Sequence, residues 1–371
     1  MMTSRRLLIL AVTAIVVIAG AVLLANRQTS TASGSNELIY PELKAQADSV
    51  KAIRIYKAGD QRALELVRDG ANWSITERNG FPAAPVKARR LVQALADAKV
   101  LEEKTSDPAR YAALSVEDVN AADAKGVRIE LDGPQTPVNL IVGKDGPGSK
   151  SSYVRRAGEK QSWLANTQLS ASPEIRDWLD KDILNVSADR VQSAYIAIDG
   201  QKPYTAAKSS RADADFKVEP LPKGKALSGS SAANGAATAL MSLTLDDVQT
   251  KASVATGKPQ AQATYKTFDG LVVQVDGFKK DGKSYITVAT SFDAKLAEQF
   301  KLKTAADEKP KADDQAKTDD KAKAETPASP PNPNVEEEAK AANAKTANWA
   351  YEIPEYKFDT LFRPVDELLK K

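Results

Sequence analysis

The most constraining feature of this sequence is an internal repeat. The alternating segment "VKAIRIYK", which begins at Val50, returns as "RVQSAYIAID" from Arg190, and "GANWSITER" returns as "ADADFKVEP". In both halves an amphipathic helix pattern and three further strand patterns follow. A helix among many short, antiparallel-type strands indicates an α+β fold. We therefore predict two tandem copies of a mainly antiparallel sheet with packed helices, over residues 48–186 and 187–371.

Each copy is expected to contain one main helix. In "PAAPVKARRLVQALADAKVL" we place Val86, Leu91, Val92 and Leu95 on one helical face, with Pro85 at the helix start. The matching helix of the second copy is expected in "GAATALMSLTLDDVQTKAS". A shorter helix in "SPEIRDWLDKDIL" is expected to close the first copy.

A long polar run interrupts the second copy. Residues 304–347 alternate Lys with Asp and Glu and contain "PASPPNPN", a composition that cannot bury a core. The stretch "NWAYEIPEYKFDTLFRPVDELLKK" then supplies the strand, at Trp349 and Tyr351, and the closing helix that the second copy still lacks. Because loop-closure entropy rises only slowly with length, a domain tolerates such an insertion. We predict a disordered insertion at 304–347 in a loop of the second copy.

An apolar run near the N-terminus, Leu7 to Ala25, follows Arg5 and Arg6. At about 1.5 Å per residue it spans roughly 28 Å, close to the hydrocarbon thickness of a bilayer. The alternative, a signal peptide cleaved within "ANRQTSTASG", usually has a shorter apolar core. Positive charge stays on the cytoplasmic side, so the bulk of the chain is expected outside the cytoplasm. We predict a cytoplasmic segment at 1–6, a transmembrane anchor at 7–25 and a polar tether at 26–47.

The chain contains no cysteine and no histidine. It therefore has no thiolate nucleophile, no Ser-His-Asp arrangement, no zinc ribbon and no disulfide. The net charge is only +3, and 52 Lys and Arg are interleaved with 49 Asp and Glu, which argues against binding of nucleic acid. We expect no enzyme activity, no catalytic residue, no cofactor and no metal site.

Asp177 and Asp180 are neighbours at helical spacing in "DWLDKDIL", where they could form an acid/base pair or hold a hard cation. The interpretation that we favour is the solvated side of a helix. Tyr153 and Arg155 share one face of the strand "YVRR" and could grip a carboxylate or phosphate, but the interpretation that we favour is a solvated strand face with a cross-strand pair. The remaining binding candidates are aromatic residues that could stack on sugar rings if they are exposed: Trp73, Trp163 and Trp349.

Several short motifs resemble one bacterial envelope family. They are the strand from Trp73 to Ile75, the strand "YVR", and the closures "WLDKDIL" and "FRPVDELL", which accompany the N-terminal apolar run. The family is known as a domain of unknown function, numbered forty-three forty. In gene setting its members resemble auxiliary components of gliding-motility-type ABC transporters. The resemblance implies a protein of the bacterial inner membrane with its bulk in the periplasm, and it carries over no catalytic residue.

Two functions of different classes are therefore expected. The first is a non-enzymatic auxiliary or docking component of an ABC-type transport system, with ABC transporter subunits as its partners and the inner membrane bound through Leu7 to Ala25. The alternative is a module that binds an envelope ligand, such as a glycan or peptidoglycan fragment. Buried tryptophans would indicate core packing, and exposed tryptophans would indicate ligand binding.

Overall fold

The computed structural model describes residues 36–300 and 334–371. The chain divides into two compact units, residues 1–180 and 181–371, earlier than the boundary predicted at 186. Both units are built mainly from antiparallel strands with a few helices, so the predicted α+β class is confirmed at this level. The predicted anchor at 7–25 lies outside the described residues.

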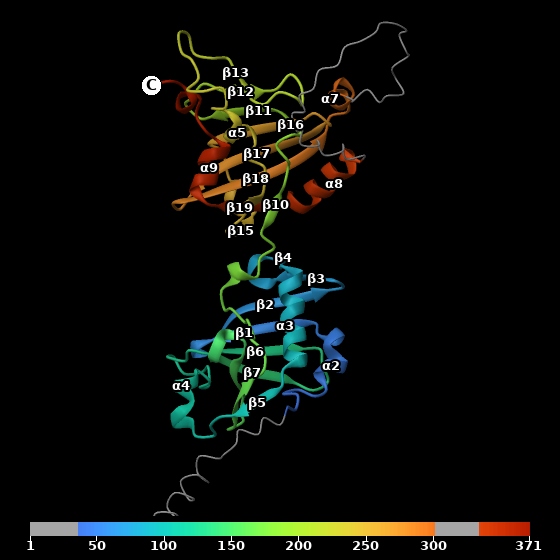
Figure 1. Cartoon of the computed structure of the whole chain (residues 1–371), viewed down its shortest axis with the longest axis vertical. Helices are drawn as coiled ribbons and strands as arrows, with labels where there is room; N and C mark the ends of the chain where they lie inside the picture. Colours follow the sequence, from blue (N-terminus) through green and yellow to red (C-terminus); the bar gives the residue numbers. More distant parts are fainter. Residues whose placement is uncertain (1–35, 301–333) are drawn as a thin grey trace, which may run out of the picture. The chain divides into compact units, whose positions relative to one another are not determined.

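The first unit contains a nine-stranded sheet with the strand order β4-β3-β2-β1-β6-β7-β8-β9-β5 (Figure 1). Its strands are β1 (Ala52–Lys57), β2 (Gln61–Asp69), β3 (Asn72–Ile75), β4 (Phe81–Pro82), β5 (Val100–Glu103), β6 (Val127–Asp132), β7 (Val138–Asp145), β8 (Ser152–Arg156) and β9 (Ser162–Ala165). The helices are α2 (Leu43–Gln46), α3 (Pro85–Asp97) and α4 (Tyr111–Leu114). Short 3-10 turns are η1 (Ala47–Ser49), η2 (Ala58–Asp60), η3 (Thr76–Arg78), η4 (Pro108–Arg110), η5 (Pro147–Ser149) and η6 (Ile175–Asp177).

Alternation along the strands decides which face of this sheet forms the core. In β1, Ile53 and Ile55 are fully buried, whereas Arg54 between them is only half-buried. Helix α3 lies across the sheet (Figure 1) and buries its apolar residues, among them Leu91 and Leu95. The opposite face of β1, β2 and β6 therefore carries the polar side chains of each strand.

The predicted apolar face of α3 needs one correction. Val86 is 62% exposed, while Leu91, Val92 and Leu95 are buried as expected. At about 100° per residue, Val86 lies on the opposite side of the helix from Leu95. Ala88 takes its place on the buried side.

The second unit contains an eight-stranded sheet with the order β13-β12-β11-β16-β17-β18-β19-β15. Its strands are β11 (Val191–Ile198), β12 (Tyr204–Ala207), β13 (Lys217–Glu219), β15 (Asp247–Thr250), β16 (Ala261–Thr267), β17 (Leu271–Lys280), β18 (Lys283–Phe292) and β19 (Trp349–Ile353), and a separate two-stranded ribbon pairs β10 (Asp182–Leu184) with β14 (Leu243–Thr244). The helices are α5 (Asn234–Ala237), α6 (Lys251–Val254), α7 (Ala294–Gln299), α8 (Val335–Thr346) and α9 (Glu355–Leu361), and a 3-10 turn, η7, covers Val365–Leu368. Without β4, the first sheet connects its strands in the same order.

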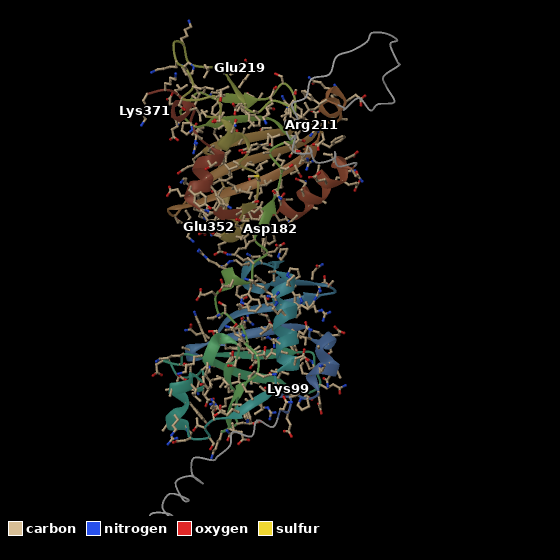
Figure 2. The ribbon with its side chains drawn as sticks, in the orientation of Figure 1. Lys99, Asp182, Arg211, Glu219, Glu352 and Lys371 are labelled. Atoms are coloured by element: carbon tan, nitrogen blue, oxygen red, sulfur yellow. The ribbon has the colours of Figure 1, made fainter. Side chains whose placement is uncertain are left out.

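The C-terminal stretch completes the second sheet. Strand β19 lies between β18 and β15, the place that β9 takes in the first sheet, so the strand predicted at Trp349 and Tyr351 is present. Figure 2 labels Glu352 of this strand, whose carboxylate lies 2.8 Å from Lys283 Nζ. After it, Phe358 of α9 and Phe362, which directly follows this helix, pack against Gly277 of β17.

The predicted insertion at 304–347 is wrong over its last part, because Val335–Thr346 form helix α8 beside β18 (Figure 1). Asn334 caps this helix by accepting a hydrogen bond from Glu337 N at 3.2 Å. Asn343 Oδ1 accepts a hydrogen bond from the backbone N–H of Thr290, which joins the helix to strand β18. Few apolar residues are needed for this packing, since small alanines allow close approach; that is why composition missed the helix.

Two other predicted helices are shorter than expected. The second copy has a single helical turn, α5, where the first copy has α3. The segment "SPEIRDWLDKDIL" forms the turn η6 and strand β10 in place of a helix. In both places buried contacts to the sheet, such as Trp178 at 3% exposure, override a helical pattern that is only a weak preference.

Gly133 lies between β6 and β7 with φ at 113°, and a Cβ there would collide with Ser49 O and lie 2.9 Å from Lys51 N. We expect Gly133→Ala to lower the free energy of unfolding of the first unit by about 3 kcal/mol, from the disfavoured φ and the overlap together. Gly158→Ala is the matched control: its φ is 83°, but nothing lies within 4 Å. It is expected to cost about 1 kcal/mol. Urea unfolding of the full chain, followed by tryptophan fluorescence, measures both; equal losses would contradict the packing argument.

Candidate functional site

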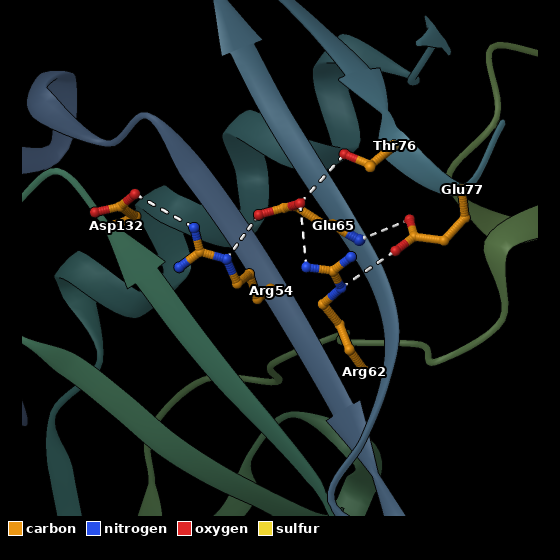
Figure 3. Close-up of polar contacts among 6 residues, drawn as sticks. All are labelled: Arg54, Arg62, Glu65, Thr76, Glu77 and Asp132. Atoms are coloured by element: carbon orange, nitrogen blue, oxygen red, sulfur yellow. Dashed lines mark hydrogen bonds and ion pairs between the residues drawn. The ribbon is translucent and has the colours of Figure 1, made fainter. Parts of the chain in front are cut away.

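A cluster of charged side chains covers the face of the first sheet that lies opposite α3. Figure 3 shows its centre, where Arg54 of β1 and Glu65 of β2 face each other across the strands. We call this surface the charged face; its charged members are Arg54, Asp60, Arg62, Glu65, Glu77, Arg128, Glu130 and Asp132. Strand alternation places the residues of β1, β2 and β6 on this face.

Glu65 is the hub of the cluster. Its carboxylate accepts from Arg54 Nε at 2.6 Å and from Thr76 Oγ1 at 3.3 Å, and it lies 3.4 Å from Arg62. Arg62 also lies 3.4 Å from the carboxylate of Glu77. This carboxylate in turn accepts a hydrogen bond from the backbone N–H of Glu65 at 2.9 Å (Figure 3). The hydrogen bond to Glu65 raises the pKa of the Arg54 guanidinium, which therefore keeps its positive charge.

A second group extends the cluster towards β6. Arg128 pairs with Asp60 at 2.7 Å and with Glu130, and its guanidinium carbon lies 4.1 Å from the centre of the Tyr56 ring. Burial, followed by the hydrogen bond to Glu130, raises the pKa of Tyr56. The ring therefore remains neutral and acts as a flat surface beneath the arginine.

The charged face is negative and open to solvent. Its three arginines face five carboxylates, and the side chain of Asp132 at its rim is 56% exposed. The matching strands of the second unit carry mainly uncharged side chains at these positions, such as Ser193, Tyr195 and Thr264. Because the same strand order forms without these charges, the fold itself does not require them.

Arg155, predicted as a ligand-binding residue, is a buried structural residue with 2% exposure. Its guanidinium donates to Val116 O at 2.7 Å, to Glu159 O at 2.8 Å and to Asp118 Oδ1 at 2.5 Å. Each of the three guanidinium nitrogens makes one of these bonds and the residue is buried, so the interpretation as a solvated strand face is also wrong. Tyr153 is half-buried beside it, with Lys104 Nζ 5.8 Å from its ring centre.

The three predicted tryptophans lie in different surroundings. Trp73 is 5% exposed, so the condition of exposure on which this candidate depended is not met. Trp163 is half-buried, with the Arg156 guanidinium 5.4 Å from its ring centre. Trp349 is half-buried in the second unit, at the start of β19. Within the first unit, Trp73 on β3 and Trp163 on β9 have five strands between them, so these two do not share one aromatic surface.

The two acidic candidates do not form a site with a third ligand. Asp177 accepts a hydrogen bond from Ser172 Oγ at 2.6 Å. Asp180 lies at the end of the first unit, where its backbone N–H donates to Pro82 O. Within residues 36–300 and 334–371, no group of three or more acidic side chains has a geometry suited to a metal ion.

A family model described as a domain of unknown function, DUF4340, matches residues 73–269, which is more than half of the chain. The chain belongs to this family. The resemblance found in the sequence is thereby confirmed. No curated protein matches the chain, and no solved structure does. Among the described residues, no helix is long and apolar enough to cross a membrane.

The charged face of this DUF4340 protein was not predicted from the sequence, although the residue pattern of each strand indicates it. "AIRIY", "ALELV" and "VRIELD" all place charges at alternate positions between buried apolar residues. Which charges meet depends on the register, which sets Arg54 opposite Glu65 on one side and Glu130 on the other. Part of the face, including Arg54 and Glu65, lies before the residues that the family model matches.

Proposed function

We propose that this protein is a non-enzymatic docking component of an ABC-type transport system, anchored in the bacterial inner membrane through Leu7 to Ala25. The charged face of the first unit is the docking surface. One observation supports this proposal. The two units share a sheet topology, but among the described residues only the first unit carries this ion-pair cluster on its sheet, so the cluster serves a purpose other than folding.

The charge of the face specifies the kind of partner. Five carboxylates against three arginines leave an excess of negative charge, so the partner is a membrane protein with a basic patch on its extracytoplasmic side. The interior of the cluster is already paired, and its rim supplies the groups that steer association. Complementary charge mainly sets specificity and the rate of encounter, and it is screened by salt.

The N-terminal apolar run supports the proposed location. A run long enough to span a bilayer, preceded by two arginines, places the rest of the chain in the periplasm beside other proteins of the inner membrane. The absence of histidine and cysteine leaves few residue types for catalysis. A role in binding a transporter subunit needs neither.

The test is crosslinking in intact membranes, followed by purification of the full chain in mild detergent and identification of its partners. ABC transporter subunits are expected in near-equal amounts. We expect Asp132→Lys, which reverses a 56% exposed rim charge, to lower the crosslinking yield about fivefold. Raising the salt concentration is expected to lower the yield of the unmodified chain as well.

The matched control is Glu103→Lys, which makes the same change of charge at an exposed position of β5, the strand at the far edge of the same sheet. Its yield is expected to stay unchanged. Equal losses in both variants would move the docking surface away from the charged face. Recovery of the chain alone, at the size of a monomer, would overturn the proposal as a whole.

A further inference from the structure

A cavity of about 310 Å³ lies in the first unit, on the face of the sheet opposite to the charged face. Its walls are the α2–η1 segment, one side of α3 and the turn between β2 and β3, and Figure 1 shows α2 next to α3. We call it the Trp73 pocket, after the aromatic residue that lines it. This volume is at the small end of ligand sites and suits one sugar-sized group.

Trp73 is the most informative residue of the pocket. The residue as a whole is 5% exposed, and it lines the pocket together with Arg68 and Arg89. No hydrogen bond joins its indole N–H to another described residue, and this nitrogen is not one of the buried polar atoms that lack a partner. The indole N–H can therefore donate to a ligand oxygen in the pocket.

Two arginines line the same pocket without a carboxylate partner among the described residues. Arg68 lies opposite Trp73 across the strands, and its guanidinium carbon is 5.9 Å from the centre of the indole ring. Arg68 donates to the carbonyl oxygens of Gly70 at 2.9 Å and Asp48 at 3.0 Å, which hold it in place without neutralising it. Arg89 projects from α3 and is exposed. With Lys44 the pocket lining carries three cations against the two carboxylates of Asp48 and Asp97, and this excess of positive charge favours an anion.

The rest of the lining suits the body of a hydroxylated ring. The carboxylates of Asp48 and Asp97 and the amide of Gln93 can accept hydrogen bonds from hydroxyl groups. Asp97 is already paired with Lys44 at 2.9 Å, so it does not cancel the charge of the arginines. Val92 and the neighbouring alanines give apolar contact with the carbon atoms of a ring.

We propose that the Trp73 pocket binds a monosaccharide-sized ligand that carries a carboxylate or a phosphate. The anion lies between Arg68 and Arg89, and an oxygen of the ligand accepts from the Trp73 indole N–H. This site is separate from the charged face, so it goes beyond docking to a transporter and its test does not depend on that proposal.

The test is calorimetric titration of the full chain in detergent with two matched pairs of probes. N-acetylmuramic acid and N-acetylglucosamine share a ring but differ in a carboxylate, and glucose 6-phosphate and glucose differ in a phosphate. We expect the anionic member of at least one pair to bind with a Kd at least tenfold lower than its neutral counterpart. Which pair shows the difference identifies the anion as carboxylate or phosphate.

Variants of residues in and beside the pocket then locate the site. Arg89→Gln is expected to raise the Kd of the anionic probe about tenfold, and Trp73→Phe to raise it severalfold by removing the indole N–H. Arg90→Gln is the control, because Arg90 is an exposed neighbour that does not line the pocket, and its Kd is expected to be unchanged. No binding of either anion at about 10 mM, equal binding of charged and neutral sugars, or equal effects of the two arginine variants would each overturn the proposal.

Discussion

A chain truncated after residue 333 is expected to lose the fold of its second unit. Such a chain lacks β19, which lies between β18 and β15, together with α8 and α9. Tyr351 and Ile353 of β19 are buried, so the core loses them; β15 loses its partner strand, and β18 keeps β17 but loses its other neighbour. The free energy of unfolding of a domain is only about 5–15 kcal/mol. We expect the loss of an internal strand and two helices to cost more than this, so the second unit should not fold.

Hydrogen exchange of the full and truncated chains, both in detergent, measures this effect. Amides of β15 and β18 are expected to exchange at the rates of an unfolded chain in the truncated form, while those of β1 and β6 in the first unit stay protected. The control is a chain that ends at Leu369, which loses only two exposed lysines. Protection of β18 in the chain that ends at residue 333 would show that the second sheet forms without its C-terminal strand.

Replacing Arg155 is expected to have the second largest effect. Arg155→Met removes donors from Val116 O and Glu159 O and an ion pair with Asp118, and leaves the two carbonyl oxygens without that partner. We expect the free energy of unfolding of the first unit to fall by about 3 kcal/mol, the usual cost of breaking a buried charged network. The segment that carries α4 is expected to loosen first, because Arg155 also stacks on Tyr111 at 4.5 Å.

Urea unfolding of the full chain, followed by tryptophan fluorescence, reports on this change, since three of the four tryptophans lie in the first unit. Arg110→Met is the control, because the Arg110 side chain is 76% exposed and its removal is expected to change stability by less than about 0.5 kcal/mol. Similar midpoints for both variants would show that the buried network contributes little. Such a result would also restore the hypothesis that Arg155 has a role in binding.

Much of the architecture could be predicted from local pattern. Period-two alternation around Ile53 and Ile55 identified β1, and the same pattern identified the strand at Trp349 beyond the polar run. Helix α8 could not be predicted in this way, because its partners are distant in sequence: it packs against β18, and its Glu338 pairs with Arg190 at 2.8 Å. A segment composed of alanines and charged residues is predicted to be unfolded unless the surface against which it packs is known.

The candidate site was harder to predict than the fold. Arg155 alternates with Val154 and therefore looked like an exposed strand residue. The structure covers that face of β8 with the segment around Val116, and burial turns a binding candidate into a structural residue. Conversely, Trp73 was a candidate only if exposed and is buried, but together with Arg68 and Arg89 it lines a pocket that no linear pattern shows.

The sequence by itself determined the α+β class, the repeat, the family and the absence of cysteine and histidine, because these follow from residue type and local period. Only the tertiary structure decided which charges meet. Cross-strand register sets Arg54 between Glu65 and Glu130, and α2, α3 and the β2–β3 turn together enclose the Trp73 pocket. Such contacts join residues far apart in the chain, and their energies depend on burial and distance, which local sequence does not encode.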